Sequence, residues 1–167
     1  MTSTATTARV IVPDALAAVD DATRFARRMR AEQLERVHAC ITSGAWHRRG
    51  HRSPTRWLVA TTLESVGTCA VTVELAERLQ EMPIARDRFA SGDLAESALR
   101  LLARAWHADI AHTFARDEQM LVGWALDLSH DDFKKVLAVW RLRAGRHPHH
   151  RPPTPSVGSR VTLAFTG

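Results

Sequence analysis

Asparagine and tyrosine are absent from this sequence of 167 residues, and cysteine occurs only twice, at Cys40 and Cys69. Two cysteines cannot form the paired CxxC motifs of a zinc knuckle, and both are expected on apolar helix faces as small buried residues in a reducing compartment. No glycine-rich phosphate loop and no GxSxG motif occurs. No apolar run approaches the roughly 20 residues that cross a bilayer, and the N-terminus has no signal-peptide pattern. We therefore expect a cytoplasmic protein without a membrane partner.

The chain contains enough apolar sequence for one folded domain, because 45% of its residues are hydrophobic. Its net charge of +5 is unevenly distributed. Arginines outnumber acids over residues 1–52, residues 146–167 carry no acid, and acids slightly outnumber bases between these flanks. Any long-range attraction for phosphate should therefore come from the flanks.

A long N-terminal helix is predicted from Pro13 to Ser43, because apolar residues recur there at helical spacing and Gly44 supplies a stop. These residues are Leu16, Val19, Ala22, Phe25, Met29, Leu34, Val37 and Ile41. Residues 45–52 show no periodicity and are predicted to form a basic loop.

Short helices joined by tight turns are predicted from Ser53 to Ala105. Ser53 can cap a helix that begins at Pro54, and the spacing of Trp57 and its apolar neighbours places the indole on the buried side. A second helix has an apolar stripe and ends before a proline. This stripe contains Val66, Cys69, Ala70, Val73, Ala76 and Leu79, and the helix ends at Met82-Pro83.

Pro83 then opens a further turn, in which Ile84 and Phe89 are expected to point inward. Ser91-Gly92 breaks this segment, and Asp93-Leu94 introduces the next helix. The apolar stripe of that helix consists of Leu94, Ala98, Leu101, Leu102 and Ala105.

Two more helices are predicted before the C-terminal tail. The first carries the apolar residues Ile110, Phe114, Met120, Leu121, Trp124 and Leu128, and the second carries Phe133, Val136, Leu137 and Trp140. Ser129 and Asp132 resemble a capping box that starts the second helix, and Gly145 closes it. The tail is predicted to be a proline-rich linker followed by one strand around Val161. A lone strand has no partner, so it resembles the first strand of a sheet in a longer protein.

The sequence therefore predicts an all-α bundle of about six or seven helices, with a Pro/His/Arg-rich C-terminal tail and a lone terminal strand. The helical domain is expected to span residues 1–145, and the linker and truncated strand residues 146–167.

The ordered anchors of residues 53–143 resemble a known family. They are Trp57-Leu58, Val73-x-Leu75-Ala76-x-x-Leu79-x-x-Met82-Pro83, Gly92-x-Leu94, Glu118-x-x-Leu121 and Leu128-Ser129. This set is similar to the helical domain of unknown function on the N-terminal side of many actinobacterial HNH endonucleases, the 13E12 repeat family. One departure is Ala95, where the family tends to place a hydroxyl residue that caps a helix, and Asp93 is the substitute cap.

The nuclease centre implied by this resemblance has no counterpart in the residues. HNH chemistry needs histidines and usually an asparagine, and the adjacent pair His149-His150 is followed by two prolines. Glu35-x-x-His38 has the spacing of a bundle metal site, but only one copy exists, so a surface pair is favoured. His47 and His51 lie among arginines, and His147 belongs to the tail. We expect no catalytic residue, no metal and no cofactor.

Two arginine clusters are the candidate nucleic-acid contacts. They are Arg24, Arg27, Arg28 and Arg30 on the first helix, and Arg48, Arg49 and Arg52 in the basic loop. A helix-turn-helix over residues 66–105 would expose only two arginines, Arg100 and Arg104, so core packing is favoured there.

The expected function is a non-catalytic helical module that positions DNA weakly and without sequence preference for a nuclease domain. The alternatives are a protein-interaction or homo-oligomerisation module that docks through the long first helix, or a degenerate remnant of a longer HNH protein. The structural anchors expected in every case are Ser53, Pro54, Trp57, Pro83, Gly92 and Ser129.

Overall fold

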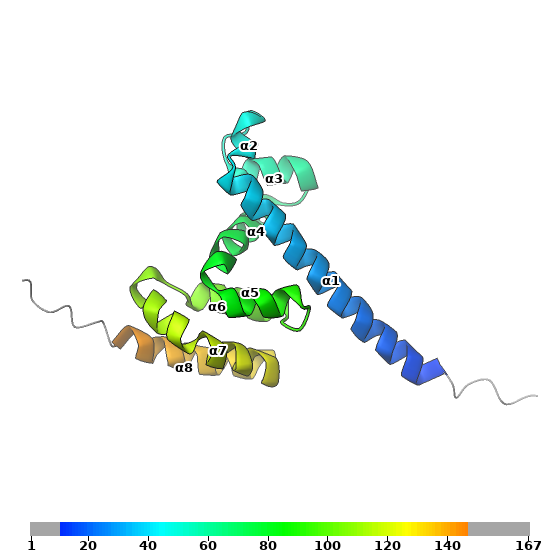
Figure 1. Ribbon diagram of the computed structural model, residues 1–167, viewed down its shortest axis with the longest axis vertical. Helices are drawn as coiled ribbons and strands as arrows, with labels where there is room; N and C mark the ends of the chain where they lie inside the picture. Colours follow the sequence, from blue (N-terminus) through cyan, green and yellow to red (C-terminus); the bar gives the residue numbers. More distant parts are fainter. Residues whose placement is uncertain (1–10, 147–167) are drawn as a thin grey trace, which may run out of the picture.

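The computed structural model describes residues 11–146, and this part of the chain is all-α, with eight α-helices, two 3₁₀ helices and no strand (Figure 1). The helices are α1 (Ile11–Thr42), α2 (Ala45–Arg48), α3 (Pro54–Thr62), α4 (Val66–Arg78), η1 (Leu79–Glu81), α5 (Pro83–Ala90), α6 (Glu96–Ala105), η2 (Ala108–Ile110), α7 (Ala111–Asp127) and α8 (His130–Arg146). The predicted fold class is confirmed, although the α-helices number eight in this part rather than six or seven. The predicted strand lies outside the described residues, and α8 continues through Gly145 instead of closing there.

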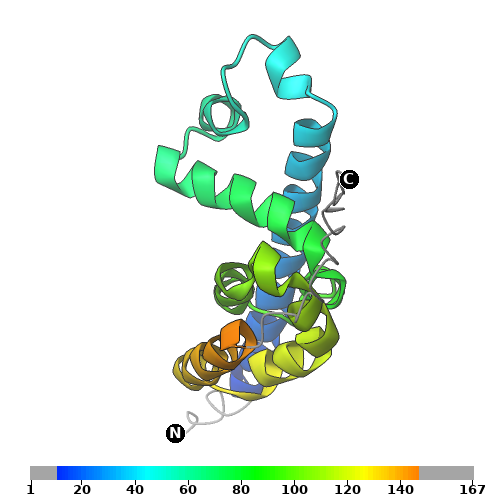
Figure 2. The same ribbon diagram turned by 90° about the vertical axis from the view of Figure 1, so that its left-hand side faces the viewer.

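Helix α1 is the longest helix of the described residues, and its 32 residues correspond to about 48 Å of helix. It packs against α4 and α5, and α4 also packs against α3. Helices α7 and α8 lie side by side at the far end, as Figures 1 and 2 both show. The N-terminal half of α1 projects beyond the rest of the fold (Figure 1). Only the C-terminal part of the predicted apolar stripe of α1 is therefore buried: Leu34 and Val37 are buried, whereas Leu16 and Val19 are exposed.

The segment predicted as a basic loop contains the four-residue helix α2. Gly44 adopts the left-handed conformation with φ of 65°, and its carbonyl then accepts hydrogen bonds from the amides of His47 and Arg48. This local turn needs no apolar periodicity, because its hydrogen bonds lie within a few residues. A search of the sequence for apolar periodicity therefore cannot detect α2.

The predicted start of α3 is confirmed. Ser53 accepts a hydrogen bond from the amide of Arg56 at 3.2 Å, and Pro54 is the first helical residue. Trp57, however, is only half-buried against the core, whereas the side chain of the next residue, Leu58, is 4% exposed. The short helix α3 is covered from one side by α4, so the indole stays at the edge of the core instead of anchoring it.

The buried face of α4 only partly matches the predicted stripe. Cys69, Ala76 and Leu79 are buried as predicted, and Val73 packs half-buried against the core. Val66 and Ala70 are exposed instead, and Thr72 and Leu75 are buried in addition. Because α4 is held between α1 and α3, the buried side is the one that these two neighbours share. Pro83 begins α5, as the sequence predicts, and Met82 before it is fully buried.

The turn between α5 and α6 is pressed against the backbone of α1. Gly92 has φ of +84°, and a Cβ atom at this position would lie 2.7 Å from the carbonyl oxygen of Arg24. Only glycine fits both the left-handed conformation and this approach. The expected cap at Asp93 is wrong: α6 begins at Glu96 after Ala95, and the Asp93 carboxylate accepts a hydrogen bond from Ser91 at 2.9 Å.

A buried carboxylate from α7 caps the start of α5. Glu118 is 2% exposed, and its Oε1 accepts a hydrogen bond from the amide of Ala85 at 2.9 Å. Met82, the residue before α5, provides no side-chain cap, so Glu118 satisfies amides that would otherwise be orphaned. Burial raises the pKa of Glu118, and the hydrogen bonds from the amides of Ala85 and Ile84 only partly oppose this rise.

Helix α8 begins at the predicted cap and is anchored by a tryptophan. Ser129 accepts a hydrogen bond from the amide of Asp132 at 3.2 Å and donates one to its carboxylate at 2.8 Å. Trp140 is 7% exposed, donates its Nε1 proton to Asp117 at 2.9 Å, and packs edge-on against Phe114. The tryptophan that fixes the core is thus on α8.

No helix between residues 11 and 146 combines the length and apolar character needed to cross a bilayer.

The first prediction compares two glycine substitutions. Gly92→Ala should destabilise the protein by roughly 2–4 kcal/mol, because the new methyl group meets the α1 backbone in a left-handed conformation. Gly123→Ala is the matched control: it lies inside α7 with no atom within 4 Å of the added Cβ, and should stabilise by about 0.5–1 kcal/mol. Urea unfolding measures both changes, and an unchanged Gly92→Ala variant would contradict the close approach.

The second prediction concerns Glu118. Glu118→Ala leaves the α5 amides without an acceptor and opens a void, at a cost of about 2–4 kcal/mol. Glu118→Gln resembles the protonated acid and should stay within about 1 kcal/mol of the wild type at neutral pH.

The pH dependence of this pair has a definite sign. Because the pKa of Glu118 is raised in the folded protein, the folded state binds a proton more tightly than the unfolded chain. The stability of the wild type relative to Glu118→Gln should therefore fall as pH rises from below the ordinary glutamate pKa through the raised one. Urea unfolding at a series of pH values checks this, and a difference that grows with pH would refute it.

Candidate functional site

The arginines of the first predicted cluster lie beside the α5–α6 turn. Arg27 donates from Nη1 to the carbonyl oxygens of Gly92 and Asp93, at 3.2 and 3.3 Å. Arg24 forms a 3.6 Å ion pair with Asp93. Arg28 is exposed on the same helix. Two of these side chains therefore hold α1 on the turn, and are not simply presented to solvent.

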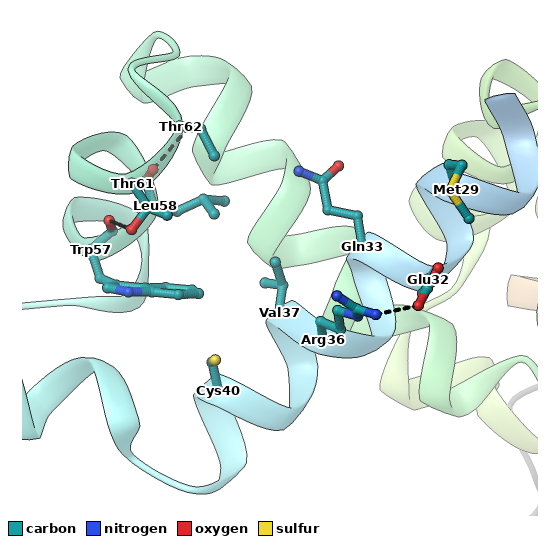
Figure 3. A pocket seen from close by; sticks show the side chains of 10 residues that line it. All are labelled: Met29, Glu32, Gln33, Arg36, Val37, Cys40, Trp57, Leu58, Thr61 and Thr62. Atoms are coloured by element: carbon teal, nitrogen blue, oxygen red, sulfur yellow. Dashed lines mark hydrogen bonds and ion pairs between the residues drawn. The ribbon is translucent and has the colours of Figure 1, made fainter.

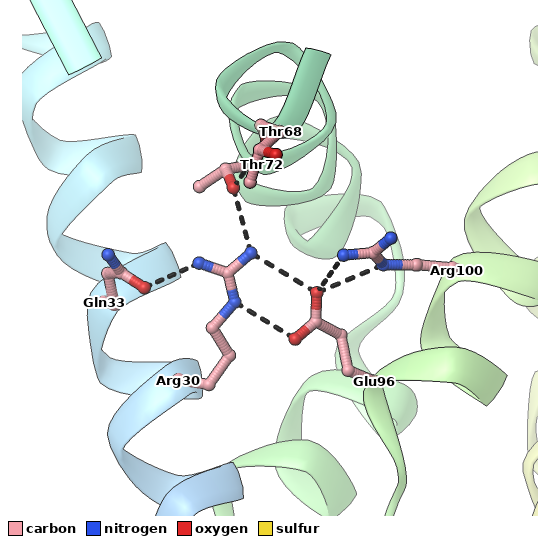
Figure 4. A network of polar contacts seen from close by, with 6 residues as sticks. All are labelled: Arg30, Gln33, Thr68, Thr72, Glu96 and Arg100. Atoms are coloured by element: carbon pink, nitrogen blue, oxygen red, sulfur yellow. Dashed lines mark hydrogen bonds and ion pairs between the residues drawn. The ribbon is translucent and has the colours of Figure 1, made fainter. Parts of the chain in front are cut away.

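Arg30 is the centre of a polar network that joins α1, α4 and α6 (Figure 4). Its guanidinium donates to both carboxylate oxygens of Glu96, at 3.1 and 3.3 Å, and to the hydroxyl of Thr72 at 2.9 Å. Arg100 binds the same carboxylate from the other side at 2.7 Å.

The charge state of Glu96 follows from this network. Partial burial by itself would raise the pKa of Glu96, but the hydrogen bonds and positive charges of Arg30 and Arg100 outweigh it, so the pKa is lowered. The network therefore contributes stability above the ordinary glutamate pKa, and this contribution is lost as pH falls through the lowered value. Because Arg100 binds Glu96, and Glu96 also binds Arg30 of α1, Arg100 on the face of α6 that a helix-turn-helix would present to DNA is already paired, whereas Arg104 is exposed.

The second predicted cluster lies at the α2–α3 end of the molecule. Arg48, Arg49 and Arg52 are all exposed, and the guanidinium of Arg48 donates to the carbonyl of Ser43 at 2.7 Å. No acidic residue occurs from position 36 to position 63, which covers the end of α1, all of α2 and α3, and their connections. This end of the fold is therefore uniformly basic, in contrast to the mixed charges around Arg24 and Arg30.

A groove of about 370 Å³ runs between α1 and α3 (Figure 3). Its lining is mostly apolar, and Trp57 and Cys40 face it from the two sides. The residues that line it are Met29, Glu32, Gln33, Arg36, Val37, Cys40, Trp57, Leu58, Thr61 and Thr62. An ion pair between Arg36 and Glu32 lies along the α1 wall. Trp57 therefore belongs to a surface groove, a role that its place in the sequence did not reveal.

The exposed half of α1 is the feature that sequence periodicity missed. Every residue from Asp14 to Ala26 is exposed. Leu16, Val19 and Phe25 are 65%, 62% and 58% exposed, and Met29 at the groove is 45% exposed. Periodicity marks a helix as amphipathic without showing whether its apolar face has a neighbour.

The predicted metal candidates are not gathered into a site. Glu35 accepts a hydrogen bond from Gln80 at 3.5 Å, and His47 packs edge-on against Trp46. In residues 11–146 no group of three histidine, cysteine or carboxylate side chains has the geometry of a metal site. His147, His149 and His150 lie outside the described residues.

Comparisons of the chain with protein-family models, with curated proteins and with solved structures return no match. The similarity to the HNH-associated helical domain therefore stays a prediction from the sequence.

The third prediction separates structural from surface arginines on α1. Arg30→Ala should cost about 1.5–3 kcal/mol, because Glu96 and Thr72 lose a partner at a partly buried position. Arg28→Ala removes the same charge from an exposed position and should change stability by less than about 0.5 kcal/mol. Thermal and urea unfolding measure both, and equal effects would show that the network of Arg30 contributes nothing beyond its charge.

Proposed function

We propose that the chain is a helical module without a catalytic centre of its own that contacts the DNA backbone through its α2–α3 end. The observation that carries this proposal is the run of residues 36–63, which contains exposed arginines and no acid. A surface of one sign attracts phosphate without reading bases, and each neutralised phosphate releases bound counterions. The resemblance of residues 53–143 to the HNH-associated domain adds support from the sequence.

The contact is assigned to Arg48, Arg49 and Arg52 in preference to the cluster on α1. Arg27 and Arg30 are already bound to carbonyl and carboxylate oxygens of the turn and of α6, and leaving these partners would offset much of the energy of a new phosphate contact. The α2–α3 arginines have no such carboxylate partner among the residues that the structure describes. Binding through backbone phosphates should tolerate any duplex sequence.

The fourth prediction is a salt-dependent titration. A fluorescent DNA duplex should bind weakly at low ionic strength, and if three phosphates are contacted the affinity should fall about 20-fold for a threefold rise in salt. Arg48→Glu, Arg49→Glu and Arg52→Glu combined should abolish the anisotropy change.

The control for this experiment is a variant with the same change in net charge at the other end of the fold. Arg104→Glu, Arg141→Glu and Arg143→Glu alter three exposed arginines of α6 and α8. This variant should retain binding to within about threefold, since α6 and α8 pack mainly against α4, α5, α7, η2 and each other rather than against α2 or α3, and salt screens exposed charges at a distance. Equal loss in both triple variants would refute the assigned contact, and no binding at low salt would refute the function.

The observation that favours a protein-interaction module instead is the exposed apolar face of α1. This face is separate from the basic end, so both activities can exist in one chain.

A further inference from the structure

We propose that the exposed half of α1 pairs with the same segment of a second copy of this chain, in antiparallel orientation. A helix extension of 13 exposed residues, Asp14–Ala26, is marginally stable alone in water, because most helical stability comes from packing of an apolar face. Phe25 and its apolar neighbours leave such a face unpacked.

The apolar residues form one straight line along the helix. Ala15, Ala18, Ala22, Phe25 and Met29 are separated alternately by three and four residues, which is the spacing of a two-helix seam. Val19 and Ala26 border this line on one edge. Ala31 and Leu34, which pack into the core, lie on another side of α1.

The same line continues into the α1–α3 groove. Met29 belongs to both, and Glu32, Arg36 and Cys40 follow it on the groove wall after three, four and four residues. A helix laid along the exposed half of α1 therefore reaches the groove opposite Trp57, as the arrangement in Figure 3 allows. One occupant covers both surfaces.

Side-chain sizes favour the chain itself as that occupant. In an antiparallel pair centred between Thr23 and Arg24, Phe25 of each copy lies opposite Ala22 of the other, and Met29 lies opposite Ala18. Each large side chain thus meets a small one, as close packing of two helices requires. In this register Ala15 approaches the groove of the other copy.

Charges select the antiparallel orientation. Asp14, Asp21 and Arg28 are seven residues apart, so they lie on one edge of the apolar line. In an antiparallel pair this edge meets its own copy, which places Arg28 beside Asp21 twice. In a parallel pair it would meet the opposite edge, which carries Val19 and Ala26 and no charge.

The two folded bodies do not collide in this arrangement. Each body contacts α1 from Arg24 onward, on the C-terminal side of the proposed centre of pairing, so antiparallel pairing directs the two bodies to opposite ends of the helix pair (Figure 1). An interface formed by one exposed helix segment of 13 residues is small for specific association. A dissociation constant in roughly the micromolar range is therefore expected.

The fifth prediction tests the pairing with the full chain by analytical ultracentrifugation up to about 100 µM, a concentration chosen for an interface of this size. The wild type should show a monomer–dimer equilibrium. Ala22→Glu places a charge at the centre of the seam and should weaken dimerisation at least about tenfold. Ala17→Glu is the matched control, because Ala17 is exposed on the opposite side of α1, and should change it by less than about twofold. Both positions are exposed, so neither substitution threatens folding.

A charge swap tests the orientation. Asp21→Arg and Arg28→Asp should each weaken the dimer by about three- to tenfold, and the double variant should recover most of the wild-type affinity. The affinity recovers in the double variant only if residue 21 of one copy contacts residue 28 of the other.

Three outcomes overturn the proposal. These are a dimer that is insensitive to Ala22→Glu, a charge swap without recovery, and a chain that stays monomeric throughout the concentration range. In a monomer, hydrogen exchange then distinguishes the remaining occupants: slow exchange of the amides around Phe25 assigns the face to another segment of the same chain, and fast exchange leaves it to a different protein. DNA binding by the α2–α3 end does not enter any of these measurements.

Discussion

The contact between the middle of α1 and the α5–α6 turn is the constraint on which the rest of the arrangement depends. Gly92 brings the turn so close to the carbonyl of Arg24 that no side chain fits between them. Arg27 then caps the turn by donating to the carbonyls of Gly92 and Asp93, and Arg30 ties α1 to Glu96 one helix further on. Steric fit and polar contacts act at one place, so they set the angle and the position of α1 together.

This contact divides α1 into two functionally different halves. On the C-terminal side the helix is packed, its apolar residues enter the core, and it carries α2 and α3 to a basic end. On the N-terminal side the helix leaves the fold with its apolar face exposed. The two candidate activities, contact with phosphate and pairing of helices, follow from these halves. They require different chemistry: pairing uses the apolar line that runs from the N-terminal half of α1 to the groove, and phosphate contact uses the exposed arginines at the α2–α3 end.

The arginines illustrate how packing changes the meaning of a charge cluster. In the sequence, Arg24, Arg27, Arg28 and Arg30 form the densest basic group. In the fold, Arg27 and Arg30 are half-buried donors to specific oxygens. The less dense group in residues 48–52 remains exposed and far along the chain from any carboxylate. Whether an arginine is free to contact phosphate depends on neighbours that are distant in the sequence. The number of arginines per stretch of sequence therefore does not show which cluster is the better phosphate contact.

The sequence by itself determined the features whose cause is local. The caps at Ser53 and Ser129, the prolines that open α3 and α5, and the break at Gly92 all rest on hydrogen bonds or steric effects within a few residues. The all-α fold class followed from helical periodicity for the same reason. The short helix α2 was missed because it depends on the left-handed conformation of Gly44 and carries no apolar pattern.

Tertiary structure alone decided which side of each helix is buried and which groups remain available. Glu118 was named from the sequence as one anchor of the family resemblance, without a structural role, and its role as the cap of α5 requires two elements that lie 33 residues apart to meet. Trp57 was expected in the core and lines a groove, since α3 is covered on one side only. Periodicity describes a helix relative to its own axis, whereas burial depends on where the neighbouring helices lie, and long-range packing alone sets their positions.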